Sequence, residues 1–199
     1  MGVQDGVDNL VRALDILVND LGRKDVLCVL IGGKGDALPK LKSLVDQLHL
    51  EEHVWFTGFI PDADVMRYLS TADICLDPNP SSPLNDVSTW IKVMEYMALG
   101  KPVVSFDLKE TRTSAGEAAA YVPPNDEAAF AKAVAALMDD ADRRRKMGAI
   151  GRQRVDEKLS WNITSRNLLS AYGQLLRTTF PAANAQALPP ESSSRTAGA

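Results

Sequence analysis

Cysteine is scarce in this sequence. Only Cys28 and Cys75 occur among 199 residues, and each lies in a short apolar stretch. They are far apart along the chain and do not fit the spacing of metal ligands. We therefore expect two buried, reduced thiols in a cytoplasmic protein, rather than a disulfide.

Long apolar runs and a surplus of basic charge are missing too. Apolar runs such as Val26–Ile31 are far too short to cross a bilayer. No basic start followed by an apolar stretch predicts a signal peptide. The formal net charge is −4, and acidic and basic residues are interspersed along the sequence. The sequence therefore lacks the cluster of basic residues that is typical of a nucleic-acid-binding protein. The sequence also holds no Asp or His cluster with the spacing of a metal site, and no metal is expected.

Two hydrophobic periodicities alternate along the chain. Apolar residues at three- and four-residue spacing predict helices over residues 7–21, 38–48, 62–70, 88–99 and 126–138, the last capped by Asp126. Continuous apolar runs predict buried strands over residues 26–31, 54–59, 74–76, 102–106 and 120–122. Strands alternating with helices predict an α/β fold, a Rossmann-like parallel sheet with helices on both faces.

Two more helical stretches follow, near residues 140–158 and 162–179. Residues 182–199 are rich in Ala, Pro and Ser and show no periodicity. We expect one domain over residues 1–180 and a disordered tail over residues 181–199.

Two loops have the position of a ligand site, since open α/β sheets bind ligands beyond the carboxyl ends of their strands. The first, Gly32 to Gly35, lets a backbone approach a ligand closely. Taken alone, this short glycine-rich loop is better explained as a tight turn between a strand and a helix.

The second loop, Asn85–Thr89, leads into the helix predicted over residues 88–99. A helix start suits a diphosphate, and the Ser88 or Thr89 hydroxyl could cap the helix or donate to a phosphate oxygen. Ser88, Lys92 and Glu95 would share one face, with Lys92 near phosphate and Glu95 accepting from ribose hydroxyls. An exposed Lys–Glu pair on a solvated helix explains the same spacing.

The run Lys92–Val104, with the sequence KVMEYMALGKPVV, resembles the signature of family 4 of the retaining glycosyltransferases. Four other landmarks resemble the family in the same order: Val29–Gly33, Val54–Pro61, Ala72–Ile74 and Pro123–Asp126. The resemblance as a whole covers about Gly2 to Leu176. The resemblance implies the carboxy-terminal half of a GT-B fold, the half that binds the nucleotide-sugar. It also implies an enzyme that moves a sugar from that donor to an acceptor with retention.

The resemblance carries roles onto particular residues. Glu95 matches the second glutamate of a Glu-x7-Glu motif, which holds the ribose. The turn Gly58, Phe59 and Ile60 matches the place of the base, and Gly32 and Gly33 match glycines near the nucleotide. Arg112 follows a strand where the family's loop approaches the sugar and phosphates.

Three departures modify this picture. Val87 replaces the first glutamate of the motif, so recognition of the sugar must differ. The stretch Gly2–Gly6 has no counterpart of the family's phosphate-binding Arg and Lys, which makes Lys92 the leading phosphate cation. The family's first strand, together with the amino-terminal domain that holds the acceptor site, is not matched.

We therefore expect a truncated or partial enzyme that binds a nucleotide-sugar weakly and transfers none by itself. The complete enzyme would use a carbohydrate or lipid-linked acceptor, need no metal cofactor, and be able to associate peripherally with a membrane. Polysaccharide biosynthesis is the implied setting. Two alternatives remain: a non-catalytic nucleotide-sugar-binding module, and half of a GT-B-type epimerase or phosphorylase.

Overall fold

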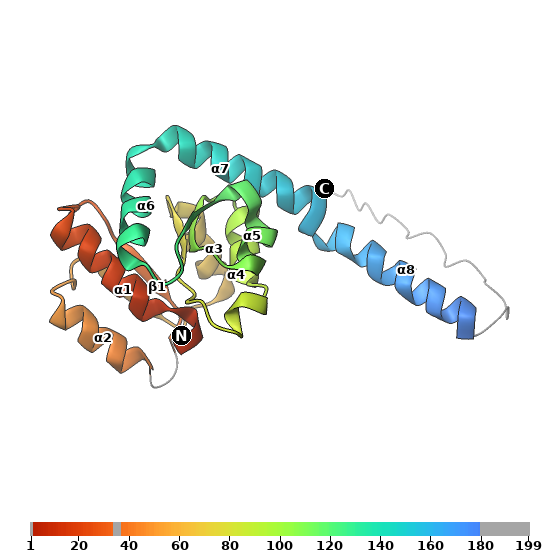
Figure 1. Ribbon diagram of the computed structural model, residues 1–199, viewed down its shortest axis with the longest axis horizontal. Helices are drawn as coiled ribbons and strands as arrows, with labels where there is room; N and C mark the ends of the chain where they lie inside the picture. Colours follow the sequence, from red (N-terminus) through yellow and green to blue (C-terminus); the bar gives the residue numbers. More distant parts are fainter. Residues whose placement is uncertain (1, 34–36, 180–199) are drawn as a thin grey trace, which may run out of the picture. The chain divides into compact units, whose positions relative to one another are not determined.

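The computed structural model describes residues 2–33 and 37–179 of the chain (Figure 1). Two sequence predictions, the end of the turn at Gly35 and the disordered tail over residues 181–199, lie outside these residues. The chain divides into two units, the first ending at Leu159 and the second beginning at Ser160.

Among the described residues of the first unit, five strands form two parallel sheets. One sheet pairs β1 (Cys28–Ile31) with β2 (Val54–Gly58). The other has the order β3 (Cys75–Asp77), β4 (Val103–Phe106) and β5 (Ala119–Val122). The predicted strands and their parallel pairing are confirmed, but they form two sheets rather than one.

Helices follow the strands in alternation, as predicted. The helices of the first unit are α1 (Val7–Asp15), α2 (Ala37–Gln47), α3 (Asp62–Thr71), α4 (Ile91–Ala98), α5 (Lys109–Ala115), α6 (Glu127–Asp139) and α7 (Ala141–Arg154). Two π-helical turns, Ile16–Asp20 and Val155–Leu159, extend α1 and α7. Short 3-10 turns occupy Val3–Asp5, Asn85–Val87 and Gly116–Ala118.

The Asp126 cap is confirmed, since its carboxylate accepts a hydrogen bond of 2.8 Å from the amide of Ala129. Helix α5 was not predicted, because its sequence KETRTSA is short and polar and shows no apolar periodicity.

Side chains of β4 point alternately into two apolar cores, one on each face of its sheet. Val104 and Phe106 join the larger core, which α1 and α6 cover. Val103 joins a smaller core beneath α4 and α5. Figure 1 shows α1 and α6 on one side of the strands and α4 and α5 on the other, so helices cover both faces.

Helix α7 approaches the end of α4 closely at a pair of glycines. A Cβ atom on Gly148 would lie 2.0 Å from the carbonyl oxygen of Gly100. Gly100 itself has a φ of 66°, the left-handed conformation that ends many helices. The predicted end of the helix at Gly100 is confirmed, and Gly148 is required for this contact.

The second unit is described as the helix α8 (Trp161–Thr179), which agrees with the predicted helical end. Several of its large apolar side chains are exposed: Trp161, Leu168, Leu169, Tyr172, Leu175 and Leu176. Among the described residues, no helix combines the length and the apolar character needed to cross a membrane.

Candidate functional site

Three loops are fastened together beyond the carboxyl ends of the strands. Gly6, with a φ of 63°, lies so close to the loop after β3 that a Cβ atom there would be 1.8 Å from the carbonyl oxygen of Pro78. The side-chain nitrogen of Asn85 donates a hydrogen bond to the backbone carbonyl of Gln4 at 3.1 Å. The Ser81 amide donates to the side chain of Asn125, in the loop after β5, at 3.0 Å. These contacts hold the three loops together as a backbone frame. The frame lies at the carboxyl edge of the strands, where the sequence predicts a ligand site.

A buried carboxylate lies under this frame. Asp77, at the end of β3, is fully buried and accepts hydrogen bonds from Asn79 at 2.7 Å and Ser105 at 2.9 Å. The Thr111 hydroxyl is a more distant donor at 3.4 Å. Burying a charged carboxylate costs desolvation free energy unless a cation pairs with it. We therefore expect a cation next to Asp77.

Lys92 supplies that cation. Its ammonium group lies 3.1 Å from Asp77 and donates to the side-chain oxygen of Asn79 at 2.7 Å. It also sits 5.2 Å from the ring centre of Trp90. With three N–H donors and two of these partners taking one each, Lys92 keeps capacity for a further acceptor. Sequence reasoning named Lys92 but missed Asp77, Asn79 and Ser105, for which the strand-ending Asp-Pro was the available signal.

Helix α4 begins at Ile91, three residues later than predicted. Ser88 therefore lies outside the helix, and the prediction that it shares a helical face with Lys92 and Glu95 is wrong. The residue before the helix, Trp90, provides no side-chain cap, so the proposed capping by Ser88 or Thr89 is wrong as well. The physical reason is that Asn85–Val87 forms its own 3-10 turn and the chain runs extended from Ser88 to Trp90.

The two hydroxyls have other partners. The Ser88 hydroxyl donates to the carbonyl of Leu84 at 2.7 Å, and the Thr89 hydroxyl donates to Glu110 at 3.3 Å. The second bond ties the loop before α4 to the start of α5. Both side chains border the loop, but each would have to exchange a protein partner for a ligand.

Glu95 is the free carboxylate of this region. It lies on α4, is exposed, and forms no hydrogen bond or ion pair with the described residues. Lys92 is paired with Asp77 instead, so the alternative of an exposed Lys–Glu pair is wrong. The Glu95 oxygens are available as acceptors for a ligand.

The guanidinium of Arg112 is already paired within the protein. It makes two hydrogen bonds to Asp107, of 2.7 and 2.6 Å, and lies 4.2 Å from the ring centre of Tyr121. The hydrogen bonds from Arg112 hold the pKa of Asp107 below its usual value and raise the pKa of Arg112. Burial raises the pKa of Tyr121 to about 12. Arg112 is thus a half-exposed cation whose charge Asp107 already balances.

The glycine turns after β1 and β2 lie together. The Gly32 amide donates to the carbonyl of Gly58 at 2.9 Å, and Gly32, Gly33 and Gly58 all have positive φ. Phe59 beside them is 75% exposed, and Ile60 is half-buried. An aromatic face and open backbone at one turn fit a flat ring such as a nucleotide base.

Two buried polar atoms at this edge lack partners among the described residues. They are the side-chain oxygen of Asn85 and the indole nitrogen of Trp90. Each such atom costs about 1–3 kcal/mol if it stays unpaired. They lie at the two ends of the loop before α4.

A family model described as "Glycosyl transferases group 1" matches residues 1–140. The chain is similar to a phosphatidyl-myo-inositol mannosyltransferase of Mycobacterium leprae, with 32% identity over 80% of this chain and 41% of that protein. It is also similar to a D-inositol 3-phosphate glycosyltransferase of Nocardia farcinica, with 29% identity over 85% of this chain and 38% of that protein. The chain thus spans less than half the length of these curated relatives.

Solved structures share the fold at lower identity. A sucrose-phosphate synthase from Thermosynechococcus elongatus superposes with a TM-score of 0.78 at 24% identity, over 89% of this chain and 44% of that chain. HepE from Anabaena, solved in complex with UDP, gives a TM-score of 0.76 at 16% identity, over 87% and 46%. The carboxy-terminal domain of a group 1 glycosyl transferase from Francisella tularensis gives 0.68 at 19% identity, over 79% and 81%.

Proposed function

The chain belongs to the group 1 glycosyltransferases, and on that basis we propose that it binds the nucleoside-diphosphate sugar donor from which a sugar is transferred with retention. The observation that carries the proposal is Glu95. It is an exposed and unpaired carboxylate on α4, inside the stretch that resembles the family signature. A carboxylate can accept hydrogen bonds from two ribose hydroxyls at once.

The diphosphate would lie above the loop before α4. Lys92 is half-buried and is held by Asp77 and Asn79, so its charge would be in place before the ligand arrives. A cation fixed in advance stabilises the negative charge that develops on a departing diphosphate. In this proposal Lys92 does so without a metal ion, and Ser88 and Thr89 offer hydroxyls nearby. Arg112 has a secondary place, because a phosphate would have to displace Asp107.

The base would lie at the turn Gly58–Ile60, against Phe59, with Gly32 and Gly33 leaving room for the nucleotide. UDP is the first nucleotide to try, since one structure of similar fold was solved with it. The acceptor, a carbohydrate or a lipid-linked sugar, would be bound by polypeptide that the relatives contain beyond the part matched here. Cytoplasmic polysaccharide biosynthesis is the setting that we propose.

The test is a calorimetric titration of the chain with UDP, GDP and ADP, repeated with 2′-deoxy-UDP or the matching deoxynucleotide. Glu95→Ala should weaken binding at least tenfold, because hydrogen bonds to a charged acceptor contribute about 1.5–3 kcal/mol each. Asp46→Ala, which removes an exposed carboxylate from α2, is the matched control and should leave binding unchanged.

The deoxynucleotide tests whether the affinity lost in Glu95→Ala comes from the contact with the ribose. Loss of the 2′-hydroxyl should weaken binding to the unaltered protein but not to Glu95→Ala, since that variant no longer has the acceptor. Equal losses in both proteins would show that Glu95 does not hold the ribose. No binding of any diphosphate would contradict the proposal as a whole.

The chain alone should bind the sugar donor without transferring the sugar. Incubation with UDP-glucose or GDP-mannose and an oligosaccharide or lipid acceptor should release no nucleotide above the rate in buffer. Release with matched formation of a glycosylated product would contradict this part of the proposal and would place the catalytic groups within the 199 residues.

A further inference from the structure

The carboxylate of Glu110 lies beside the loop that precedes α4. Its Oε2 atom accepts a hydrogen bond of 3.3 Å from the hydroxyl of Thr89, and α5, the helix of Glu110, packs against the 3-10 turn Asn85–Val87. The Glu110 side chain is half-buried, and among the described residues it has no cation and no second hydrogen-bond donor. An ionised carboxylate can accept about four hydrogen bonds. Glu110 therefore keeps most of its acceptor capacity for a ligand.

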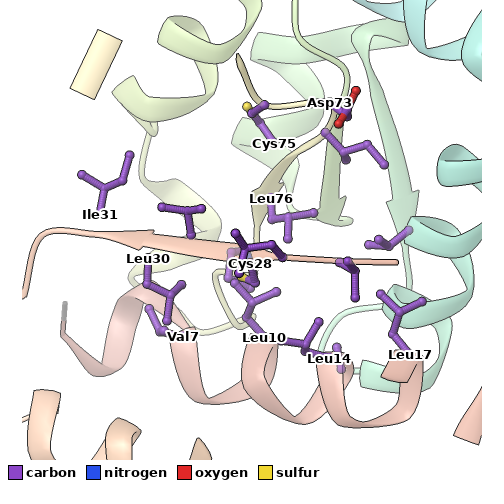
Figure 2. Close-up of a pocket in the computed structure, with 18 of the residues that line it drawn as sticks. Val7, Leu10, Leu14, Leu17, Cys28, Leu30, Ile31, Asp73, Cys75 and Leu76 are labelled. Atoms are coloured by element: carbon purple, nitrogen blue, oxygen red, sulfur yellow. The ribbon is translucent and has the colours of Figure 1, made fainter. Parts of the chain in front are cut away.

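The buried carboxylate of Asp77 points to the face of the sheet that α4 and α5 cover. Figure 2 shows Leu76 of β3 near Leu10 of α1, where both side chains line an apolar cavity. Because successive side chains of a strand point to opposite faces, the next residue, Asp77, points away from α1. Lys92 of α4 meets Asp77 there at 3.1 Å, and α5 packs beside α4 on the same side (Figure 1).

Helix α5 is fixed near both of its ends. Near its start, the hydroxyl of Thr111 donates at 3.4 Å to Asp77, the carboxylate that also holds Lys92. Near its end, the guanidinium of Arg154 donates to two carbonyls of the last turn, each at 2.6 Å. Glu110 is next to Thr111 in the chain, so its backbone has a fixed place relative to Lys92 before a ligand arrives.

A bound donor would extend from the nucleotide toward Glu110. A nucleoside-diphosphate sugar is a row of base, ribose, two phosphates and sugar. The proposed function puts the ribose at Glu95 and the phosphates at Lys92, about one turn nearer the start of α4. A further step in this direction leads to Thr89, which is bonded to Glu110. The sugar therefore comes next to Glu110 when the ribose and the phosphates are bound as proposed.

We propose that Glu110 accepts hydrogen bonds from two adjacent hydroxyls of the transferred sugar and so selects donors that carry a neutral hexose. The inference rests on the proposed donor function. Two carboxylate oxygens can accept from two neighbouring hydroxyls at once, and the bond from Thr89 fixes the orientation of the carboxylate. Val87, 71% exposed on the turn packed against α5, offers apolar surface to the C–H groups of the sugar ring. A sugar with a carboxylate of its own meets a like charge at Glu110 and is rejected.

The test is a calorimetric titration of the 199-residue chain with diphosphates and with donors that add one sugar. The probes are UDP, UDP-glucose and UDP-glucuronate, then GDP, GDP-mannose and GDP-mannuronate, and finally ADP and ADP-glucose. At least one neutral hexose donor should bind about tenfold tighter than its own diphosphate, because hydrogen bonds to a charged acceptor are stronger than neutral ones. The acidic donor of the same nucleotide should bind about tenfold weaker than the neutral one, because its charge repels Glu110.

Variants at position 110 separate the contact with the sugar from the contact with the nucleotide. Glu110→Ala should remove the gain from the sugar and leave the affinity for the diphosphate close to that of the unaltered protein. Glu110→Gln keeps the size of the side chain but not its charge, so it should bind the acidic donor as tightly as the neutral one. Glu117→Gln, at an exposed carboxylate in the 3-10 turn after α5, is the matched control and should retain both the gain and the discrimination.

An equal gain from the sugar in Glu110→Ala and in the unaltered protein would overturn the inference, as would a Glu110→Gln variant that still rejects the acidic donor. So would the absence of a gain with every neutral hexose. In each of these cases, a diphosphate that binds and is weakened by Glu95→Ala leaves the proposed function standing. Failure of every diphosphate to bind would instead contradict the proposed function, and this inference with it.

Discussion

At the scale of the residue, the central arrangement is the buried pair of Asp77 and Lys92. Asp77 is fully buried, whereas the Lys92 side chain is 26% exposed, so the lysine links the interior to the edge where a ligand would lie. Because the Lys92 side chain is already held by its buried partner, it loses little conformational entropy when it binds a phosphate. The same pairing makes the site sensitive to substitution.

Removal of Lys92 should destabilise the protein. Lys92→Met leaves the Asp77 charge without its cation, and breaking a buried pair costs on the order of 3 kcal/mol. Urea denaturation of Lys92→Met should show this loss, whereas Lys40→Met, at an exposed lysine of α2, should change stability by less than about 0.5 kcal/mol. Adding Asp77→Asn to Lys92→Met should restore part of the stability, and a double variant less stable than Lys92→Met would contradict the pairing.

Residue patterns anticipated part of this site. Three-residue spacing on a helix puts Glu95 and Lys92 near each other, which is why the sequence points to both. In the structure Glu95 is unpaired among the described residues, and Lys92 is half-buried and paired with Asp77. The partners of Lys92 could not be foreseen, because Asp77, Asn79 and Ser105 come from separate elements and meet only once β3 and β4 pair.

At the scale of the element, the start of α4 was misplaced because apolar periodicity does not mark a helix boundary. The 3-10 turn Asn85–Val87 and the extended stretch before Trp90 depend on side-chain bonds such as the one from Ser88 to Leu84. Such local hydrogen bonds compete with the backbone hydrogen bonds of a helix. They do not change the spacing of apolar residues, so the sequence pattern does not reveal them. The boundaries of α2, α3 and α6, by contrast, agree with the predictions within a residue or two.

The packing of α7 on α4 should be intolerant of a single methyl group at Gly148. A Cβ atom there would meet the Gly100 carbonyl at 2.0 Å, so Gly148→Ala should force the helices apart and cost about 2 kcal/mol. Gly173→Ala in α8, where the added Cβ has no neighbour within 4 Å, is the matched control and should leave the unfolding of the first unit unchanged. Thermal denaturation followed by circular dichroism measures both, and an unaltered midpoint for Gly148→Ala would contradict the close contact.

At the scale of the whole molecule, the alternation of strands and helices predicted the Rossmann-like fold, and the comparisons place it among group 1 glycosyltransferases. The division of the strands into two sheets was not predicted from periodicity. Strand order depends on which edges meet in space, and periodicity reports only the face on which a residue lies.

The central claim is that the carboxyl edge of the sheet binds the nucleoside diphosphate of a sugar donor. The most direct measurement is an NMR titration of the ¹⁵N-labelled chain with UDP, and then with GDP and ADP. We predict that the largest amide shifts fall at residues 58–60 and 88–95 and that they saturate with the nucleotide. Shifts confined to other elements, or no shift with any of the three diphosphates, would contradict the claim.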